Sequence, residues 1–273
     1  MQKLTNQHLS AAFSYLAPEP EFNLFFIGDL EQYGMEDENV SCFTDDDWKE
    51  GMEFPYFILD YRGNILVYSR NPHYDARTVA EFLKEVKPEN ISGKDQVLRP
   101  LLKYLENKTV KPTHMARLRE IAELQREEYG ELMGRVRRLT EEDISAIYRL
   151  YLTIDEFAYT YRRKAQEECY DDIRQNCFSG MGRAYGIFEG DRLASIAQTS
   201  AENRASAMVI GVATHPESRG KGYARATVLK LCEECLADGK QFLCLFFDNP
   251  SAGRIYHSIG FEDIGIYTML RNA

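Results

Sequence analysis

The chain has 273 residues, 44% of them hydrophobic and 28% charged, which is enough for one large or two ordinary domains with a normal core. Its net charge of −10 disfavours a nucleic-acid or anionic-membrane surface, because such partners need a broad basic face; a local basic pocket is not excluded. No apolar run reaches about 18 residues and the start MQKLTNQHLS lacks a signal-peptide core, so we expect a cytoplasmic protein.

The first part of the chain alternates between helical and strand patterns. Hydrophobic spacing predicts helices over 6–16 and 21–34, two strands within 55–70 around a turn at 62–64, a helix over 76–86, a short strand at 90–93 and a helix over 96–107. Residues 112–125 begin like a strand and continue as helix or linker. The acidic run 45–47 is interpreted as a solvated loop or helix cap, because sequence alone shows no converging ligands for a metal.

The periodicity loosens at 127–134, where we place a domain boundary. The expected domains are 1–130 and 135–273. The second part predicts a strand at 135–139, a helix over 144–154 that follows the capping residue Thr140, a helix over 162–175, and strands at 183–190, 192–201 and 206–215. This mixture predicts an α/β (α+β) protein.

A loop rich in glycine and positive charge follows the last of these strands. It reads Arg219-Gly220-Lys221-Gly222-Tyr223-Ala224 and opens a long amphipathic helix. Glycine lets the backbone approach a ligand closely, and a helix N-terminus favours an anion. The loop lacks the spacing of a Walker loop or a dinucleotide fingerprint. It is therefore a candidate phosphate site, with a plain turn as the alternative.

The chain ends with a buried strand over 241–247, a helix over 250–259 and a strand over 262–270. Asn249 precedes Pro250 and is expected to cap that helix. Cys232 and Cys235 have the spacing of half a zinc site, but no second pair accompanies them and they lie within a helical pattern. We interpret the six cysteines as core thiols and expect neither a metal nor a disulfide.

The motif Arg219-x-x-Gly222-x-Ala224 and the later run DNPSAGRIYHSIGFEDIG resemble the GNAT superfamily of acyl-CoA N-acyltransferases. The likeness covers the chain from about Arg135 to its C-terminus. It implies a mostly antiparallel central sheet flanked by helices. It also implies a transferase that uses acetyl-CoA as co-substrate and acetylates a primary amine by direct attack in a ternary complex.

The resemblance also implies which residues bind acetyl-CoA. Backbone groups of Val212 and Thr214 would bind the pantetheine arm, amides of the glycine loop the pyrophosphate, and Tyr256 would act as general acid for the leaving thiolate. Tyr256 could instead be only a core aromatic. The complete set is Val212, Ala213, Thr214, Arg219, Gly220, Lys221, Gly222, Tyr223, Ala224, Asn249, Ala252 and Tyr256.

A general base is harder to identify. Some members of the family use a carboxylate on the strand before the loop, and MVIGVATHP contains none. Glu156 and the adjacent Asp155 are the leading candidates, with Glu189 and His215 behind them. Each of these could be an ordinary surface residue, and a chain of water molecules could replace them. His257 is left unassigned, because it should point to a different face of its helix from Tyr256.

The N-terminal half repeats the order of elements loosely, as in tandem members of the superfamily related to glycine N-acyltransferase. We expect a degenerate GNAT-like or accessory domain without a cofactor site, since Ile91–Asp95 lacks the phosphate motif. The acceptor is expected to be a small molecule, and a homodimer is expected from general frequency. A catalytically silent acyl-CoA sensor or scaffold is the main alternative; a plain interaction module is another.

Overall fold

The computed structural model describes residues 1–178, 180 and 182–272 and divides into two compact units. The first comprises Met1–Met115 together with the end of the chain from Ile264, and the second comprises Ala116–Asp263. This division differs from the expected one. The expected boundary at 127–134 lies inside the second unit, and most of the last strand belongs to the first.

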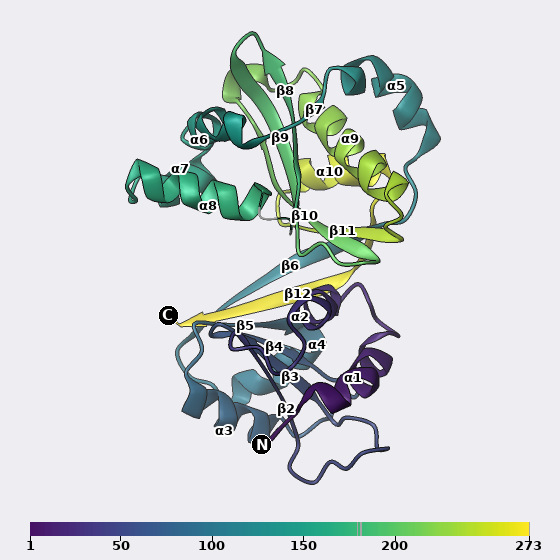
Figure 1. Ribbon diagram of the computed structural model, residues 1–273, viewed down its shortest axis with the longest axis vertical. Helices are drawn as coiled ribbons and strands as arrows, with labels where there is room; N and C mark the ends of the chain where they lie inside the picture. The colour runs from purple at the N-terminus through teal and green to yellow at the C-terminus, as the bar shows by residue number, and fades with distance from the viewer. Residues whose placement is uncertain (179, 181, 273) are drawn as a thin grey trace. The chain divides into compact units, whose positions relative to one another are not determined.

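The first unit is a sheet with helices on both faces (Figure 1). Its helices are α1 (Leu9–Leu16), α2 (Leu24–Tyr33), α3 (Ala76–Val86) and α4 (Asp95–Leu98), with 3-10 turns at Asn6–His8 and Arg99–Lys103. Its strands are β1 (Gln2–Lys3), β2 (Val40–Thr44), β3 (Phe57–Tyr61), β4 (Asn64–Tyr68), β5 (Asn90–Lys94) and most of β12 (Glu262–Asn272). Most of β6 (Lys108–Leu118) also belongs to this unit. The strands lie in the order β1-β2-β3-β4-β5-β12-β6; among the first six, β4 with β5 is parallel and the other pairs are antiparallel.

Two expectations for this unit need correction. The strand β2 was missed, although it alternates buried and half-buried residues as a strand at a core should. The helix expected over 96–107 is instead a short α4 that ends at Leu98 and continues as a 3-10 turn. Pro100 explains the change, because it has no N–H to donate and its ring opposes continuation of an α-helix.

The second unit begins at the end of β6 (Lys108–Leu118), the strand in which the chain leaves the first unit. Its helices are α5 (Glu123–Gly134), α6 (Ile144–Tyr151), α7 (Asp155–Tyr161), α8 (Gln166–Phe178), α9 (Tyr223–Ala237) and α10 (Pro250–Ile259), with 3-10 turns at Glu141–Asp143 and Pro216–Ser218. The strands β7 (Arg137–Arg138), β8 (Ala184–Glu189), β9 (Arg192–Ser200), β10 (Ser206–Thr214) and β11 (Phe242–Phe247) lie in the order β11-β10-β9-β8-β7.

Of the strand pairs in this second sheet, β10 with β11 is parallel, and β7 with β8, β8 with β9 and β9 with β10 are antiparallel. Helices α6, α7 and α8 lie on one face, and α5, α9 and α10 on the other (Figure 1). The expected fold class, a mixed and mostly antiparallel sheet flanked by helices, is therefore confirmed.

The stretch 127–134, expected to be loose, is the second half of helix α5. Its pattern is weak because it has few apolar residues: Met133 is buried, and Tyr129 and Leu132 are partly buried against the core. These three pack toward α9, and such contacts stabilise a helix that lacks a broad apolar stripe. The strand expected at 135–139 shrinks to two residues, and the helix expected at 162–175 is replaced by α7 and α8.

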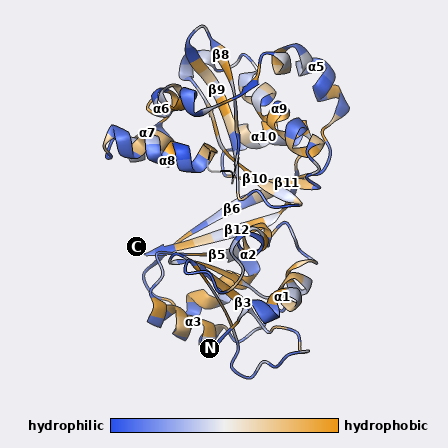
Figure 2. Cartoon of the chain, in the orientation of Figure 1, coloured by the Kyte–Doolittle hydropathy of each residue, from blue (hydrophilic) through white to orange (hydrophobic). Residues whose placement is uncertain are grey.

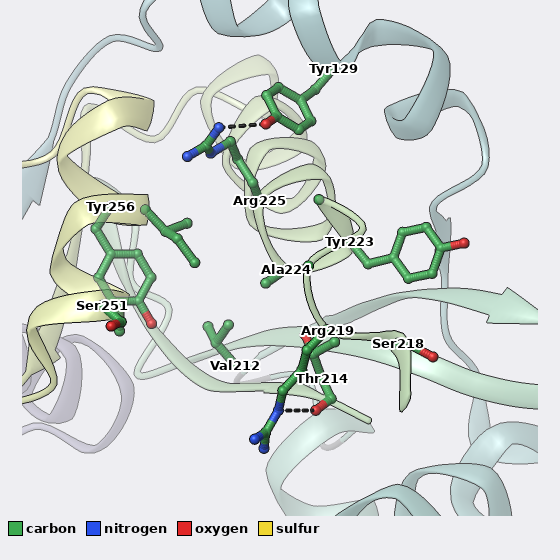
Figure 3. Close-up of a pocket in the computed structure, with 14 residues that line it drawn as sticks. Tyr129, Val212, Thr214, Ser218, Arg219, Tyr223, Ala224, Arg225, Ser251 and Tyr256 are labelled. Atoms are coloured by element: carbon green, nitrogen blue, oxygen red, sulfur yellow. Dashed lines mark hydrogen bonds between the residues drawn. The ribbon is translucent and has the colours of Figure 1, made fainter. Parts of the chain in front are cut away.

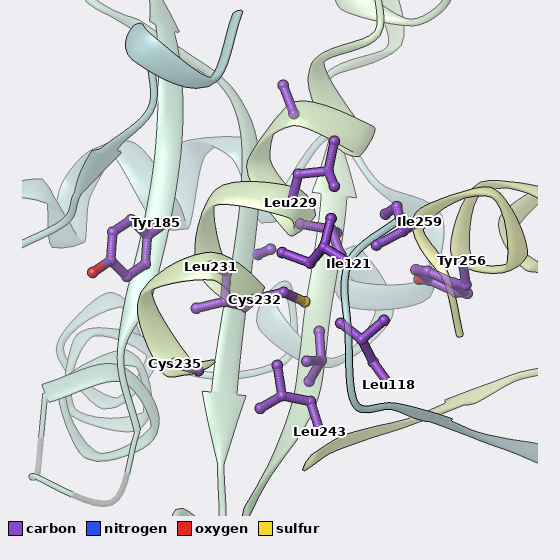
Figure 4. Packing of buried hydrophobic residues seen from close by; sticks show 14 of the residues in the cluster. Leu118, Ile121, Tyr185, Leu229, Leu231, Cys232, Cys235, Leu243, Tyr256 and Ile259 are labelled. Atoms are coloured by element: carbon purple, nitrogen blue, oxygen red, sulfur yellow. The ribbon is translucent and has the colours of Figure 1, made fainter. Parts of the chain in front are cut away.

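The core on the α9 face explains the cysteine pattern. Cys232 and Cys235 are fully buried beside Leu231 and Leu243, as expected of core thiols (Figure 4). Helix α8 is mostly hydrophilic along its length (Figure 2), so it buries only a narrow stripe. Within the described part of the chain, every helix is too short or too polar to cross a membrane.

Candidate functional site

A bulge interrupts strand β10 just before the glycine loop. Ile210 pairs with Gln198 and Ala213 with Ile196, so Gly211 and the residue after it face a single residue of β9. Gly211 has a φ of +61°, which glycine adopts at little cost. A bulge leaves one residue outside the regular ladder. The end of β10 can therefore offer backbone groups to a ligand.

The pairing of β10 with its neighbour β11 ends just before the bulge. The parallel register of β10 with β11 runs from Ser206 opposite Phe242 to Val209 opposite Leu245. Beyond it, β10 continues to Thr214 and β11 to Phe247. The segment of β10 beyond this paired register carries both the bulge and the approach to the loop.

The loop delivers the chain into helix α9 through two left-handed glycines. Gly220 has a φ of +77° and Gly222 a φ of +80°, and Gly222 is the residue before the helix. A Cβ at Gly222 would lie 2.9 Å from a ring carbon of Tyr129, so space as well as backbone conformation demands glycine there. The N–H groups of the first turn have no partner within a helix and carry its positive dipole end.

These elements surround a cavity of about 440 Å³, within the usual range for small-molecule sites (Figure 3). Strand β10, the loop, α9, α10 and α5 all contribute to it. The lining residues are Tyr129, Val212, Thr214, Ser218, Arg219, Gly220, Gly222, Tyr223, Ala224, Arg225, Ser251, Ala252, Ile255 and Tyr256. None of these residues of the described chain is a carboxylate or a histidine.

Most residues named from the sequence meet at this cavity, and three do not line it. Ala213 is buried on the opposite face of the sheet, because side chains alternate along a strand. Lys221 points to Glu189, with 2.7 Å between Nζ and Oε1. Asn249 is exposed and caps α10, its Oδ1 accepting from the backbone N–H of Ser251 at 2.8 Å. The capping prediction is confirmed, and a role for these residues toward a ligand stays a prediction.

Tyr256 combines a core ring with a hydroxyl at the cavity. The residue is 8% exposed, and its ring centroid lies 6.0 Å from those of Phe247 and Phe261. Figure 3 shows the hydroxyl end of the ring directed toward Val212. Burial raises the pKa of Tyr256 to about 12, so the hydroxyl keeps its proton at neutral pH.

Glu189, at the end of β8, holds the glycine loop in place through hydrogen bonds. Its carboxylate accepts hydrogen bonds from Lys221 Nζ and from Arg192 Nη2 at 2.8 Å, and also from the hydroxyls of Ser218 at 2.8 Å and Tyr223 at 3.0 Å. These donors, Lys221 and Arg192 foremost, hold the pKa of Glu189 well below its usual range. An ionised carboxylate with four donors is a structural anchor for the loop rather than a base.

The other candidate bases lie away from the cavity lining. Glu156 and Asp155 are exposed in the first turn of α7. His215 lines a separate hollow of about 470 Å³ beside α6, and its Nδ1 accepts from the backbone N–H of Glu217 at 3.3 Å. Within the described ranges, no group of three or more His, Cys, Asp or Glu side chains is arranged to hold a metal.

Sequence reasoning missed five residues of the lining: Tyr129, Ser218, Arg225, Ser251 and Ile255. All but Tyr129 adjoin a residue named from the sequence, and Ile255 also follows Ala252 at helical spacing. The sequence therefore contained a signal for these four. Tyr129 held none. It reaches the cavity because α5 packs against α9, where Arg225 Nη1 donates a hydrogen bond to the Tyr129 hydroxyl.

Comparison with protein-family models matches residues 135–264 to the acetyltransferase (GNAT) domain. Among solved structures, a Drosophila protein is similar over 100% of this chain and 98% of its own, with 11% identity and a TM-score of 0.66. A GCN5-related N-acetyltransferase-like protein from Streptococcus suis matches 98% of this chain and 99% of its own, with 14% identity and a TM-score of 0.58. A GCN5-related N-acetyltransferase from Kribbella flavida covers 80% and 86%, with 13% identity and a TM-score of 0.54. The comparison with curated proteins finds no significant match.

Proposed function

We propose that this protein transfers an acetyl group from acetyl-CoA to a primary amine of a small molecule, because residues 135–264 match the model of the acetyltransferase (GNAT) domain. The observation that carries the proposal is the cavity itself. It unites a helix N-terminus behind two left-handed glycines, a bulged strand and a buried tyrosine hydroxyl. A phosphate group, an extended amide chain and a leaving thiolate need these three features in turn.

The residues of the cavity fit acetyl-CoA in chemical terms. The first-turn amides of α9 and the guanidinium of Arg219 would bind the pyrophosphate. Backbone groups around Val212 and Thr214 would bind the amides of the pantetheine arm as an added strand does, since the register of β10 with β11 ends at Val209, before these residues. Acetyl-CoA supplies a thioester carbonyl that an amine can attack.

Tyr256 is suited to assist the leaving group. As the new C–N bond forms and the C–S bond breaks, negative charge moves to sulfur. A phenol with a pKa near 12 is protonated at any working pH and can donate its hydrogen bond to that sulfur. The amine must already have lost its proton. Glu156 remains our candidate for that step, with water as the alternative, because the described lining offers no carboxylate.

The same lack of a carboxylate in the described lining favours a second function, an acyl-CoA-binding sensor or scaffold without turnover. It would use the identical cavity, so binding alone does not separate the two. Acetylation of any member of a panel of small amines would decide for the enzyme. Tight binding with no acetylation across the panel would decide for the sensor.

The first experiment is isothermal titration of acetyl-CoA into wild type and into Gly222→Glu. The glutamate side chain would occupy the phosphate position, and its charge would repel the phosphate. Gly190→Glu is the control, because Gly190 has a similar positive φ and its Cβ would meet nothing within 4 Å. We expect micromolar binding that is lost in Gly222→Glu and kept in Gly190→Glu. If wild type binds no acyl-CoA, the proposed function falls.

The second experiment measures acetylation by Tyr256→Phe. We expect kcat to fall by about 10²-fold to 10⁴-fold, the usual contribution of a proton donor, while the Kd for acetyl-CoA stays within a factor of about two. The control is Tyr223→Phe, which removes the hydroxyl of another tyrosine of the lining, one that donates to Glu189 rather than facing Tyr256. Equal kcat values for Tyr256→Phe and wild type would remove Tyr256 from the mechanism.

For the first unit we propose an accessory role, as a degenerate GNAT-like half without its own cofactor site. The Drosophila and Streptococcus suis structures share the fold of the chain along nearly its whole length, so both units have counterparts of similar fold in those chains.

A further inference from the structure

Arg225 occupies an unusual electrostatic position in the cavity. Its guanidinium carbon lies 4.9 Å from the ring centroid of Tyr129, and Nη1 donates to the hydroxyl of that tyrosine (Figure 3). Its Nε is buried and has no acceptor among the described residues. A charged donor left without an acceptor costs stability, so this arrangement is incomplete as it stands.

Three other basic residues near the loop have an acceptor for the side-chain nitrogen described here. Lys221 and Arg192 both pair with the Glu189 carboxylate. Arg219 donates through Nε to the backbone carbonyl of Thr214 at 3.4 Å. In the described chain, Arg225 is thus a cation that lines the cavity with only a neutral phenol as hydrogen-bond partner. An anion in the cavity would pair with this guanidinium.

We propose that Arg225, positioned by Tyr129, forms a second anion subsite that binds the 3′-phosphate on the ribose of CoA. This inference rests on the proposed function. The pyrophosphate already has the loop amides and Arg219, whereas the ligand carries one more phosphate, on its ribose. A guanidinium binds such a dianion through paired N–H groups, which a lysine cannot reproduce.

The contribution of Tyr129 is to hold the guanidinium in place. It comes from α5, which ends at Gly134 and so precedes the residues matched to the GNAT domain. The residue that positions Arg225 therefore comes from a helix outside the matched residues. The subsite would make the cavity select CoA over its 3′-dephospho form.

The test is isothermal titration of CoA and of 3′-dephospho-CoA into wild type, Arg225→Gln and Arg219→Gln. We expect wild type to prefer CoA, and Arg225→Gln to weaken CoA binding by about 10-fold to 100-fold while 3′-dephospho-CoA changes by less than about 2-fold. Arg219→Gln is the matched control. It should weaken both ligands by the same factor, because both carry the pyrophosphate.

Two further variants separate the subsite from a structural effect. Arg225→Lys keeps the positive charge but loses the paired N–H donors of the guanidinium, and it should retain part of the preference for CoA. Tyr129→Phe removes only the hydroxyl that positions Arg225, and should reduce the preference several-fold without lowering the melting temperature. Equal weakening of both ligands in Arg225→Gln, or no preference in wild type, would overturn the subsite and leave the proposed function intact. Failure of wild type to bind either ligand would overturn both.

Discussion

Gly211 must be glycine for two reasons, its backbone conformation and the lack of space for a side chain. Its φ of +61° is unfavourable for other residues, and a Cβ there would lie 1.9 Å from Nε2 of Gln198. That side chain cannot move freely, because Nε2 donates to the Tyr151 hydroxyl at 2.7 Å and Oε1 accepts from Cys177 at 2.6 Å. A side chain at position 211 would therefore displace a buried polar cluster.

Gly211→Ala should accordingly cost more than the backbone strain alone. We expect it to lower the free energy of unfolding by about 2–4 kcal/mol, the sum of left-handed strain and overpacking. Gly190→Ala is the matched control, since it shares the φ (+59°) but has open space at Cβ, and it should cost about 1 kcal/mol. Urea unfolding of both variants checks this. Equal losses would show that the polar cluster yields without penalty.

Asp29, on α2 of the first unit, makes stability depend on pH. Burial raises the pKa of its carboxyl to about 7. Because the folded chain then holds the proton more tightly than the unfolded chain, the stability from this group is present below about pH 4 and is lost as pH rises to about 7. The loss amounts to no more than about 4 kcal/mol.

Asp29→Asn should remove this pH dependence, because the amide does not titrate. Denaturant unfolding of wild type and of the variant at several values between pH 4 and pH 8 measures the effect. Wild type should lose stability relative to the variant as pH rises. A difference between the two proteins that stays constant over the range would show that the Asp29 carboxyl titrates normally.

At the scale of elements, β12 pairs with a strand that is far from it in sequence. It follows α10 directly, yet it pairs antiparallel with β5, Tyr267 opposite Lys94 and Leu270 opposite Ile91. Tyr267 and Leu270 are 1% and 0% exposed. The last strand thus joins the sheet of the first unit beside β5, and Leu270 belongs to the core of that unit.

Leu270→Ala is therefore expected to destabilise the first unit by about 2–5 kcal/mol, the usual cost of such a core truncation. Met269→Ala, one residue earlier on the other face of the strand, should cost less than half as much, because Met269 is only half-buried. Denaturant unfolding followed by the fluorescence of Trp48, which is buried in the first unit, reports the change. Similar losses for both variants would contradict this placement of the strand.

At the scale of the whole molecule, two electrostatic effects oppose each other. The net charge of −10 repels a polyanion such as CoA, while Arg219 and Arg225 in the cavity attract it. Because the screening length is about 10 Å at 0.1 M salt, charges inside the cavity should outweigh charges spread over the surface. Attraction should therefore dominate at physiological salt.

The affinity for CoA should then fall as salt is added. Between about 0.05 M and 0.5 M NaCl we expect the Kd to rise about 3-fold to 10-fold, as screening shortens the reach of these charges. Titration calorimetry at four salt concentrations measures it. Tighter binding at high salt would mean that repulsion by the whole protein outweighs the local cations.

The local elements that carry the site could be read from the sequence. The loop from Arg219 to Ala224, the cap at Asn249 and the strand over 241–247 all depend on neighbours within a few residues, and each lies where it was expected. Glycine conformations, caps and apolar runs express short-range preferences that the sequence alone determines.

Only the tertiary structure decided the rest. The bulge at Gly211, the pairing of β12 with β5 and the approach of Tyr129 to Arg225 join residues far apart in the chain. Helix α5 was missed because its stability comes from packing on α9 rather than from its own pattern. Long-range contacts leave no periodic trace in a single sequence, so the members of the cavity drawn from distant segments could not be predicted.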